Sequence, residues 1–350
     1  MNLKSAGISA LHHTGALALV RRTRRRGLVV MTYHGVLEGH DDREEFLLGN
    51  FVAAAAFERQ MSWIARRYRP VSMTEVVDAL TTGRPLPNRA ITVTFDDGFA
   101  NNFRFAFPIL RRYRVPVTIF LTTGFIGARG AFLWTERVKR AIFLTDASSL
   151  PTLVPGQLAL VLDSPGRRAH AARAVLSLLK RMPPDTRDAH VEAIEQHCGR
   201  PPLQPQDADR YDFLTWDEVR TMAADGAEFG SHTVSHPILS TLPPEDLADE
   251  LRRSKETIEA ELQRTCRVFA YPNGGQGDFG AREKLALQAC NYEVAFSQIG
   301  GINAADVDRY DVRRVNISRG FHPALLDAAL SGALLLGKAA RETLTLSRRG

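Results

Sequence analysis

Two adjacent carboxylates follow a strand-like run in this 350-residue chain. Residues 91–95 are rich in β-branched and aromatic side chains, which is typical of a buried strand. Asp96, Asp97 and Gly98 come directly after them. Because burying an unpaired charge is costly, we expect the pair at the mouth of the strand, facing a cavity, a metal or a partner cation. The plainer alternative is a polar turn in which Asp97 caps the following helix.

Two histidines could ligate a metal at the same place. His232 and His236 are four positions apart, a spacing that places two imidazoles on one side of a helical turn or on a tight loop. Alone, the spacing is weak, because short motifs often match by chance. Here it follows a short strand and therefore reaches the same mouth as Asp96 and Asp97. Two imidazoles and one carboxylate suit a divalent ion with an open position for water, and the other carboxylate is left to act as a base.

The elements that must position these residues alternate along the chain. His34 ends another apolar run, in the same topological place as the two aspartates, although a structural hydrogen bond is its alternative role. Strand-like runs alternate with helical patterns, which is typical of a parallel sheet with crossover helices. We predict strands at residues 28–35, 91–95, 115–121, 227–230, 268–271, 292–296 and 311–317. Helices are predicted at 51–68, 103–113 and 245–262, and further helix starts at Ser72 and Thr215.

Residues 124–211 break this alternation. They contain helical stretches and several prolines, but no clear strand. A structureless loop of that length is unusual in a compact domain. We therefore predict a helical insertion that caps the mouth of the sheet and contributes to substrate choice. Residues 323–350 are apolar-rich and are predicted to form a C-terminal helix.

The chain is basic, with a formal net charge of +6 and a pI of about 9.4, and its positive charge is not spread evenly. Five arginines lie between positions 21 and 26, a block that is attracted to anionic lipid or nucleic acid, or is simply solvated. No zinc-finger spacing or aromatic-interleaved basic patch favours nucleic acid, so we expect no nucleic-acid partner. Residues 6–20 are too short and too polar to span a bilayer, and they do not resemble a cleaved secretion signal. We expect residues 1–27 to form a basic leader or an interfacial helix.

The number and spacing of the three cysteines indicate the redox state of the compartment in which the protein works. Cys198, Cys266 and Cys290 are far apart and form no Cys-x-x-Cys pair. The spacing therefore predicts neither a disulfide framework nor a structural zinc site. A reducing compartment fits best, and we expect a cytoplasmic protein, peripheral to the inner face of the membrane.

Several of these segments together resemble the polysaccharide deacetylase family, also called carbohydrate esterase family 4 or the NodB-homology domain. Residues 94–98 and 231–236 are similar to its first two motifs, and residues 269–274 to a common version of the third. Residues 31–36 resemble a strand-end motif that precedes the first in many members. The resemblance covers about residues 28–319. It implies an α/β fold, a distorted (β/α) barrel of about seven strands in residues 28–322, with the helical insertion at about 124–211.

The family's roles carry over to the matching positions. The resemblance implies that Asp96 is the general base and that Asp97, His232 and His236 ligate a divalent metal ion, with zinc favoured. The metal would polarise the amide carbonyl of an N-acyl sugar and activate water. The segment at Tyr271 and Asn273 would contact the substrate, and a backbone N–H near Asn273 would stabilise the oxyanion.

The resemblance weakens toward the C-terminus. The family's Asp-Trp motif is not visible, and its Leu-x-His motif, which supplies the general acid, is not clean. His322 is the nearest candidate for the acid, followed by His34. Three arginines could support the site, although a surface position is the default expectation for each: Arg267, Arg313 and Arg314.

Motifs and resemblance together imply a metal-dependent hydrolase. It would remove an N-acyl group, in the first place N-acetyl, from an amino sugar in a glycan or a lipid-linked saccharide. One alternative keeps the fold but acts on a formamide or a small cyclic amide. Another is a catalytically inactive, glycan-binding relative. The intact pairs of aspartates and histidines argue against the last, because a binding module has no need of a free base beside a metal.

Overall fold

The computed structural model describes residues 14, 17, 27–39, 47, 49–152 and 159–334. The predicted leader of residues 1–27 therefore lies almost entirely outside the described residues. So does the end of the predicted C-terminal helix, from residue 335 onward. Within the described ranges, no helix combines the length and the apolar character that crossing a membrane requires.

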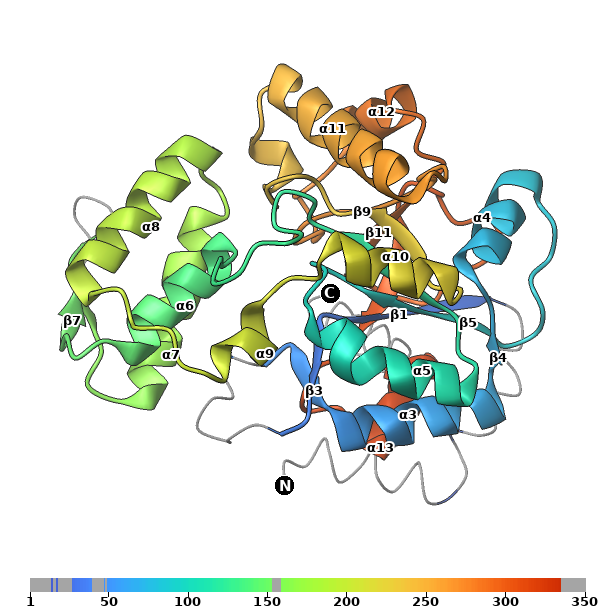
Figure 1. Ribbon diagram of the computed structural model, residues 1–350, viewed down its shortest axis with the longest axis horizontal. Helices are drawn as coiled ribbons and strands as arrows, with labels where there is room; N and C mark the ends of the chain where they lie inside the picture. The colour runs from blue at the N-terminus through green and yellow to red at the C-terminus, as the bar shows by residue number, and fades with distance from the viewer. Residues whose placement is uncertain are drawn as a thin grey trace, which may run out of the picture.

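Seven of the described strands form a closed parallel barrel (Figure 1). The ring closes because β1 and β5 pair along their whole length, from Leu28 opposite Ala90 to Tyr33 opposite Phe95. The prediction of a distorted (β/α) barrel of about seven strands is confirmed. In ring order the strands are β1 (Leu28–Tyr33), β12 (Val312–Asn316), β11 (Val294–Gly300), β10 (Val268–Ala270), β9 (Glu228–Ser231), β6 (Val117–Leu121) and β5 (Ala90–Phe95).

Short strands and crossover helices complete the barrel. Strand β4 (Arg69–Pro70) pairs with the start of β5, and β2 (Gly35–Leu37) pairs with β3 (Phe51–Ala53). The outer helices are α3 (Ala54–Arg67), α4 (Met73–Thr82), α5 (Phe107–Tyr113), α10 (Trp216–Ala224), α11 (Pro244–Leu262), α12 (Ala281–Ala289) and α13 (Pro323–Leu330). A π-helical segment, Asn102–Ala106, leads into α5, and a 3-10 turn, Leu239–Thr241, precedes α11.

Side-chain alternation along the strands creates two layers of core. Residues such as Val30, Phe120 and Phe296 pack together in one buried cluster, while their strand neighbours belong to a second cluster with the outer helices. Successive strand residues point to opposite faces, so the first cluster fills the barrel and the second lies between barrel and helices. Asp96 continues the series that runs through Thr94 and is therefore aimed at the barrel interior.

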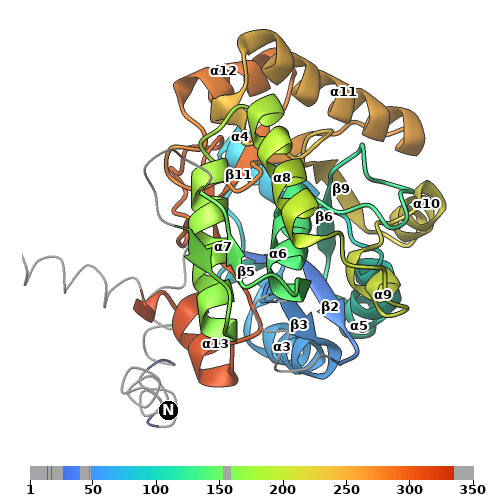
Figure 2. The same cartoon turned by 90° about the vertical axis from the view of Figure 1, so that its left-hand side faces the viewer.

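Residues between β6 and α10 form a unit with a core of its own. Its helices are α6 (Trp134–Leu144), α7 (Pro165–Leu179), α8 (Pro184–Cys198) and α9 (Asp207–Tyr211). A short antiparallel pair, β7 (Ser149–Leu150) with β8 (Leu160–Val161), was not predicted. Residues of α6, α7 and α8 share one buried cluster that is separate from both barrel layers. Figure 2 shows these three helices lying across one end of the barrel. We call this unit the insertion.

Candidate active site

A left-handed turn aims the second aspartate away from the outer face of the barrel. Asp97 has φ of 73° and Gly98 has φ of 84°. Aspartate tolerates this conformation better than most residues, and glycine adopts it without strain. In a continuing strand Asp97 would point toward the outer helices, opposite to Asp96. The turn instead brings Asp97 into the pocket at the carboxyl end of the strands.

The two histidines lie on a tight loop rather than on a helix. His232 follows β9, and both Thr233 and His236 have positive φ, 71° and 60°. The carboxylate of Glu250, on α11, fixes the loop: it accepts hydrogen bonds from the backbone amides of Val234 (2.7 Å) and Ser235 (3.0 Å). Of the two conformations open to this spacing, the tight loop is the one present.

Asp97, His232 and His236 converge on one point. Asp97 Oδ1 lies 3.5 Å from His232 Nε2 and 3.3 Å from His236 Nε2, and the three ligand atoms all lie within 4.8 Å of one another. Ligands about 2.1 Å from a tetrahedral zinc ion are roughly 3.4 Å apart, which follows from the bond lengths and the tetrahedral angle. The spacing therefore fits one divalent ion bound by all three side chains.

Hydrogen bonding prepares these atoms for a cation. His232 Nδ1 lies 2.7 Å from the carbonyl oxygen of Ala270, so it carries the proton and leaves Nε2 with a free lone pair. Asp97 Oδ1 is buried and has no hydrogen-bond partner among the described residues. A buried carboxylate oxygen without a donor is costly, and a bound cation would satisfy it.

The pKa shifts of Asp97 and His232 are also consistent with a cation-binding site. Burial tends to raise the pKa of Asp97, but the neighbouring imidazoles of His232 and His236 outweigh it and hold that pKa well below its usual range. Burial tends to lower the pKa of His232, but Asp96 and Asp97 outweigh it and raise that pKa. The lowered pKa keeps Asp97 ionised at neutral pH, and the raised pKa of His232 shows that the two carboxylates create a negative potential, which attracts positive charge.

Asp96 is held in a buried ion pair with Arg314, one of the three arginines that could support the site. Arg314, on β12, donates to Asp96 Oδ1 (2.7 Å) and Oδ2 (2.8 Å), and both side chains are fully buried. Gln298 Nε2 also donates to Oδ2 (2.7 Å). Burial tends to raise the pKa of Asp96, but the charge of Arg314 outweighs it and the pKa is lowered. Asp96 is therefore an ionised acceptor at neutral pH.

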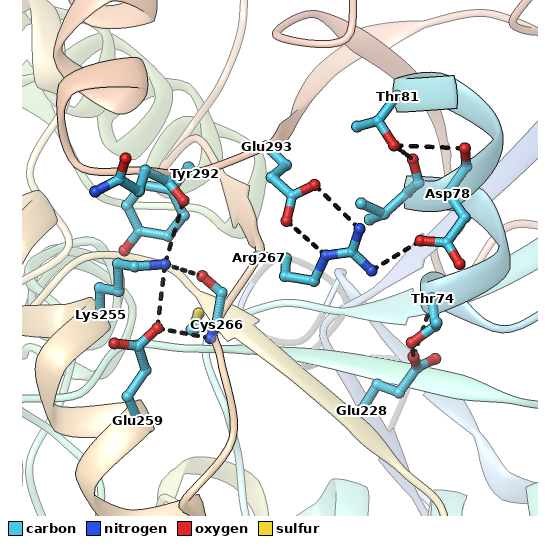
Figure 3. Close-up of polar contacts among 12 residues, drawn as sticks. Thr74, Asp78, Thr81, Glu228, Lys255, Glu259, Cys266, Arg267, Tyr292 and Glu293 are labelled. Carbon is cyan, nitrogen blue, oxygen red and sulfur yellow. Dashed lines mark hydrogen bonds and ion pairs between the residues drawn. The ribbon is translucent and has the colours of Figure 1, made fainter. Parts of the chain in front are cut away.

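The default expectation of a surface position is wrong for one of the three candidate arginines. Arg314 faces the barrel interior because it stands two residues after the buried Val312, on the same face of β12. Arg313 is exposed. Arg267 precedes β10 at the amino end of the strands, where it pairs with Asp78 and Glu293 (Figure 3). In a parallel barrel this is the end opposite to Asp96.

Barrel and insertion together line a pocket of about 420 Å³ around the histidines. The barrel contributes Asp97, His232 and His236, together with His34, Asn273 and Gln298. The insertion contributes residues of α6 and the end of α7, among them Trp134, Glu136, Lys139 and Lys180. Asp96 does not line the pocket; Gln298, which does, contacts it. The charged insertion residues carry no recognisable motif, so nothing in the sequence indicates that they line the site.

The two residues predicted to form the oxyanion loop have different positions. Asn273 lines the pocket in a left-handed conformation, with φ of 60°, and its backbone N–H has no acceptor among the described residues. The Tyr271 side chain is turned away: it is fully buried, its hydroxyl donates to the carbonyl of Tyr310 (2.9 Å), and its ring stacks on Phe279. Only Asn273 is placed to meet a substrate.

The two candidates for the general acid, His34 and His322, lie in different pockets. His34 lines the pocket with the metal-binding group and helps to lower the pKa of both Asp96 and Asp97. His322 lines a different pocket, beside α3, and caps the start of α13, where its Nδ1 accepts a hydrogen bond from the Leu325 amide. The structure therefore does not bring His322 to the site, because the residue is used to begin a helix.

With this geometry established, comparison with known proteins identifies the family. The family model of polysaccharide deacetylases matches residues 83–151 and 170–295, more than half of the chain. The chain belongs to the polysaccharide deacetylase family. The matched residues include Asp96 and three residues of the pocket, Asp97, His232 and His236.

Individual relatives agree with this family. The Bacillus subtilis protein YxkH is 20% identical over 304 residues, which cover 87% of this chain and 76% of that protein. The Escherichia coli poly-beta-1,6-N-acetyl-D-glucosamine N-deacetylase is 33% identical over 91 residues, but these cover only 26% of this chain and 13% of that protein. The structure of the Streptococcus pyogenes deacetylase PplD in complex with acetate superposes with a TM-score of 0.59 at 18% identity, covering 87% of this chain and 98% of PplD. That likeness shows the shared barrel fold.

Proposed function

We propose that this protein is a metal-dependent hydrolase that removes an N-acyl group, in the first place N-acetyl, from an amino sugar of a glycan or a lipid-linked saccharide. The observation that carries the proposal is the spacing of 3.3 and 3.5 Å between Asp97 Oδ1 and the two histidine nitrogens. Family membership supplies the reaction class, since the members that resemble this chain include N-deacetylases of poly-N-acetylglucosamine.

Asp97, His232 and His236 would hold the ion, and zinc is the first candidate because nitrogen and oxygen ligands in this number suit it. A divalent ion there supplies Lewis-acid chemistry, polarising the amide carbonyl and lowering the pKa of water. The Asn273 N–H, for which the described part of the chain offers no acceptor, would donate to the carbonyl oxygen as negative charge develops on it.

Hydrolysis joins the oxygen of water to the acyl carbon and breaks the carbon–nitrogen bond, which releases a carboxylate and a free amine. Asp96 would take the proton from water. A carboxylate offers about four acceptor positions, and Arg314 and Gln298 occupy three, so one position on Oδ1 remains. A water molecule must take that position or displace Gln298. His34 would donate a proton to the leaving nitrogen, because it is the histidine of the pocket outside the metal-binding group.

The location of the enzyme is a separate part of the proposal. Five arginines between positions 21 and 26 would draw the chain to anionic headgroups at the inner face of the cytoplasmic membrane, each contributing about 1 kcal/mol near the surface. Such peripheral attachment would suit a lipid-carried substrate of the cell envelope. The three cysteines are free, which is compatible with a reducing compartment.

Acetate release tests the proposal. The zinc-loaded protein would be incubated with N-acetylglucosamine oligomers, a lipid-linked N-acetylated saccharide, an N-formylated amino sugar and a small cyclic amide. We expect acetate and free amine from the acetylated saccharides, and no release by Asp97→Asn. Turnover of the formamide or the cyclic amide alone would replace the proposed substrate, and binding of the oligomers without turnover would indicate a glycan-binding protein.

A further inference from the structure

The insertion reaches the active site through a lysine. Lys180 follows the last residue of α7 and lines the pocket that contains the metal-binding group. The helix before it packs into the insertion's own core through Val175 and Leu179. This core is separate from both barrel layers, so the end of α7 meets the barrel at the pocket, where Lys180 makes a polar contact.

The partner of Lys180 is a residue of the barrel. Its Nζ donates to the side-chain oxygen of Asn273, in the loop between β10 and α12, and Asn273 Nδ2 donates to Asp278. Asp278 also accepts from the Gly275 amide. The Asn273 amide group therefore has a cationic donor on its oxygen side and a carboxylate on its nitrogen side, which fixes its orientation.

The backbone around Asn273 forms a tight left-handed turn. Asn273 has φ of 60°, a conformation that asparagine adopts more readily than most residues, and the next residue, Gly274, also has positive φ, 58°. A side chain at Gly274 would collide with the Tyr271 carbonyl at 2.8 Å and the Gln298 amide at 2.9 Å. The Asn273 N–H, which has no acceptor among the described residues, takes its direction from this conformation and would point elsewhere if the peptide rotated.

We propose that Lys180 is a positioning residue of the reaction: by binding the Asn273 side chain, it holds the backbone N–H of Asn273 in place for the developing oxyanion. The insertion then takes part in catalysis as well as covering the pocket. This inference rests on the proposed function, because it needs an oxyanion to form at the site.

The charge environment of Lys180 agrees with this role. Lys139, the other lysine of the pocket, is paired with Glu136 at 2.6 Å, whereas the acceptor of Lys180 is the neutral amide of Asn273. Burial lowers the pKa of Lys180, with Asp278 acting in the opposite direction. A partly desolvated ammonium on a neutral acceptor makes a charge-assisted hydrogen bond, which is stronger than a neutral one.

Steady-state kinetics on an N-acetylglucosamine oligomer test the proposal with Lys180→Met, Lys180→Arg and Arg181→Met. Removing one oxyanion donor from an enzyme typically costs 10²–10³-fold in kcat, so a donor that has lost its support should cost at least about 10-fold. We expect Lys180→Met to lower kcat by this factor with KM nearly unchanged, and Lys180→Arg to restore most of the rate. Arg181→Met makes the same charge change at the next, exposed position, and we expect wild-type kinetics.

A rise in KM alone for Lys180→Met would make Lys180 a substrate contact, and unchanged kinetics would remove its role; either result overturns the proposal. Hydrogen exchange of the peptide 271–277 gives a readout independent of turnover. We expect faster exchange in Lys180→Met than in Arg181→Met, and equal exchange would overturn the proposal. If the wild-type protein releases no acetate, the proposed function fails, while the exchange experiment still decides whether Lys180 holds the loop.

Discussion

Removal of the Arg314 side chain should destabilise the barrel from its interior. The guanidinium makes two hydrogen bonds to Asp96 and a third, of 2.8 Å, to the carbonyl of Ser297. Neither charged side chain has any exposed surface. Arg314→Leu therefore leaves a buried carboxylate without its cation, which must either stay charged at low dielectric or take up a proton.

The size of the effect follows from that burial. Breaking a buried ion pair by removing one partner typically costs about 3–5 kcal/mol in the free energy of unfolding, because the remaining charge is uncompensated. Asp96→Asn should cost a comparable amount, since it leaves the guanidinium unpaired. The double variant removes both charges, so it should be about as destabilised as either single variant.

Equilibrium urea unfolding of the wild-type protein, Arg314→Leu, Asp96→Asn and the double variant measures the coupling energy between Arg314 and Asp96. A chelator should be present throughout, because a bound metal would stabilise the folded state by mass action. Arg267→Leu is the control: this arginine also pairs with two carboxylates, Asp78 and Glu293, but it is partly exposed at the other end of the barrel (Figure 3). Exposed ion pairs contribute about 0–1 kcal/mol, so the control should lose no more than about 1 kcal/mol.

Additive losses in the double variant would refute the reasoning, since an ion pair requires a coupling energy between its members. A loss for Arg314→Leu no larger than that for Arg267→Leu would do so as well. In either case Asp96 would not depend on Arg314, and the ionised state of Asp96 would need another cause.

Three further predictions concern the metal and the membrane. Asp96→Asn should abolish acetate release while zinc content stays near one per chain, and Asp97→Asn should lose both; equal zinc loss in the two variants, measured by elemental analysis, would contradict their separate roles. Glu250→Ala frees the backbone of the histidine loop, so zinc affinity measured by chelator competition should fall about 10-fold or more, and unchanged affinity would count against the support by Glu250. Deletion of residues 1–26 should abolish sedimentation with anionic liposomes at low salt, and binding that survives the deletion would leave the membrane proposal without support.

The barrel could be predicted because strand ends carry a local signal. β-branched runs closed by glycine or by polar residues located β1, β5 and β6, and their alternation with helices indicated a parallel sheet. The helix starts at Ser72 and Thr215 were also recognisable, and both form capping boxes with the glutamate three residues on. Helix α12 escaped detection because its apolar residues do not follow a clear helical period.

The site was predictable only where motif and topology coincide. Asp97, His232 and His236 follow strands, and parallel strands bring such residues to one end of a barrel. The conformation of the histidine loop depends on Glu250, which lies 14 residues beyond His236, and no short motif connects the two. Arg314 was named as a possible support of the site but expected at the surface, because a buried arginine is rare unless it is paired.

The remaining residues of the pocket come from tertiary structure. Lys180 meets Asn273 across 93 positions of sequence, and nothing in the local sequence of either residue indicates the other. His322 was a candidate as the nearest match to an imperfect Leu-x-His motif, and the start of α13 uses it as a cap. Long-range pairings of this kind are set by packing of the insertion, which sequence patterns do not specify.

A zinc-edge anomalous diffraction map of zinc-loaded crystals would test most directly that Asp97, His232 and His236 form one metal centre. We predict a single strong peak about 2.0–2.2 Å from Asp97 Oδ1, His232 Nε2 and His236 Nε2. An anomalous peak bound by other residues, or none at these side chains under full zinc loading, would contradict it.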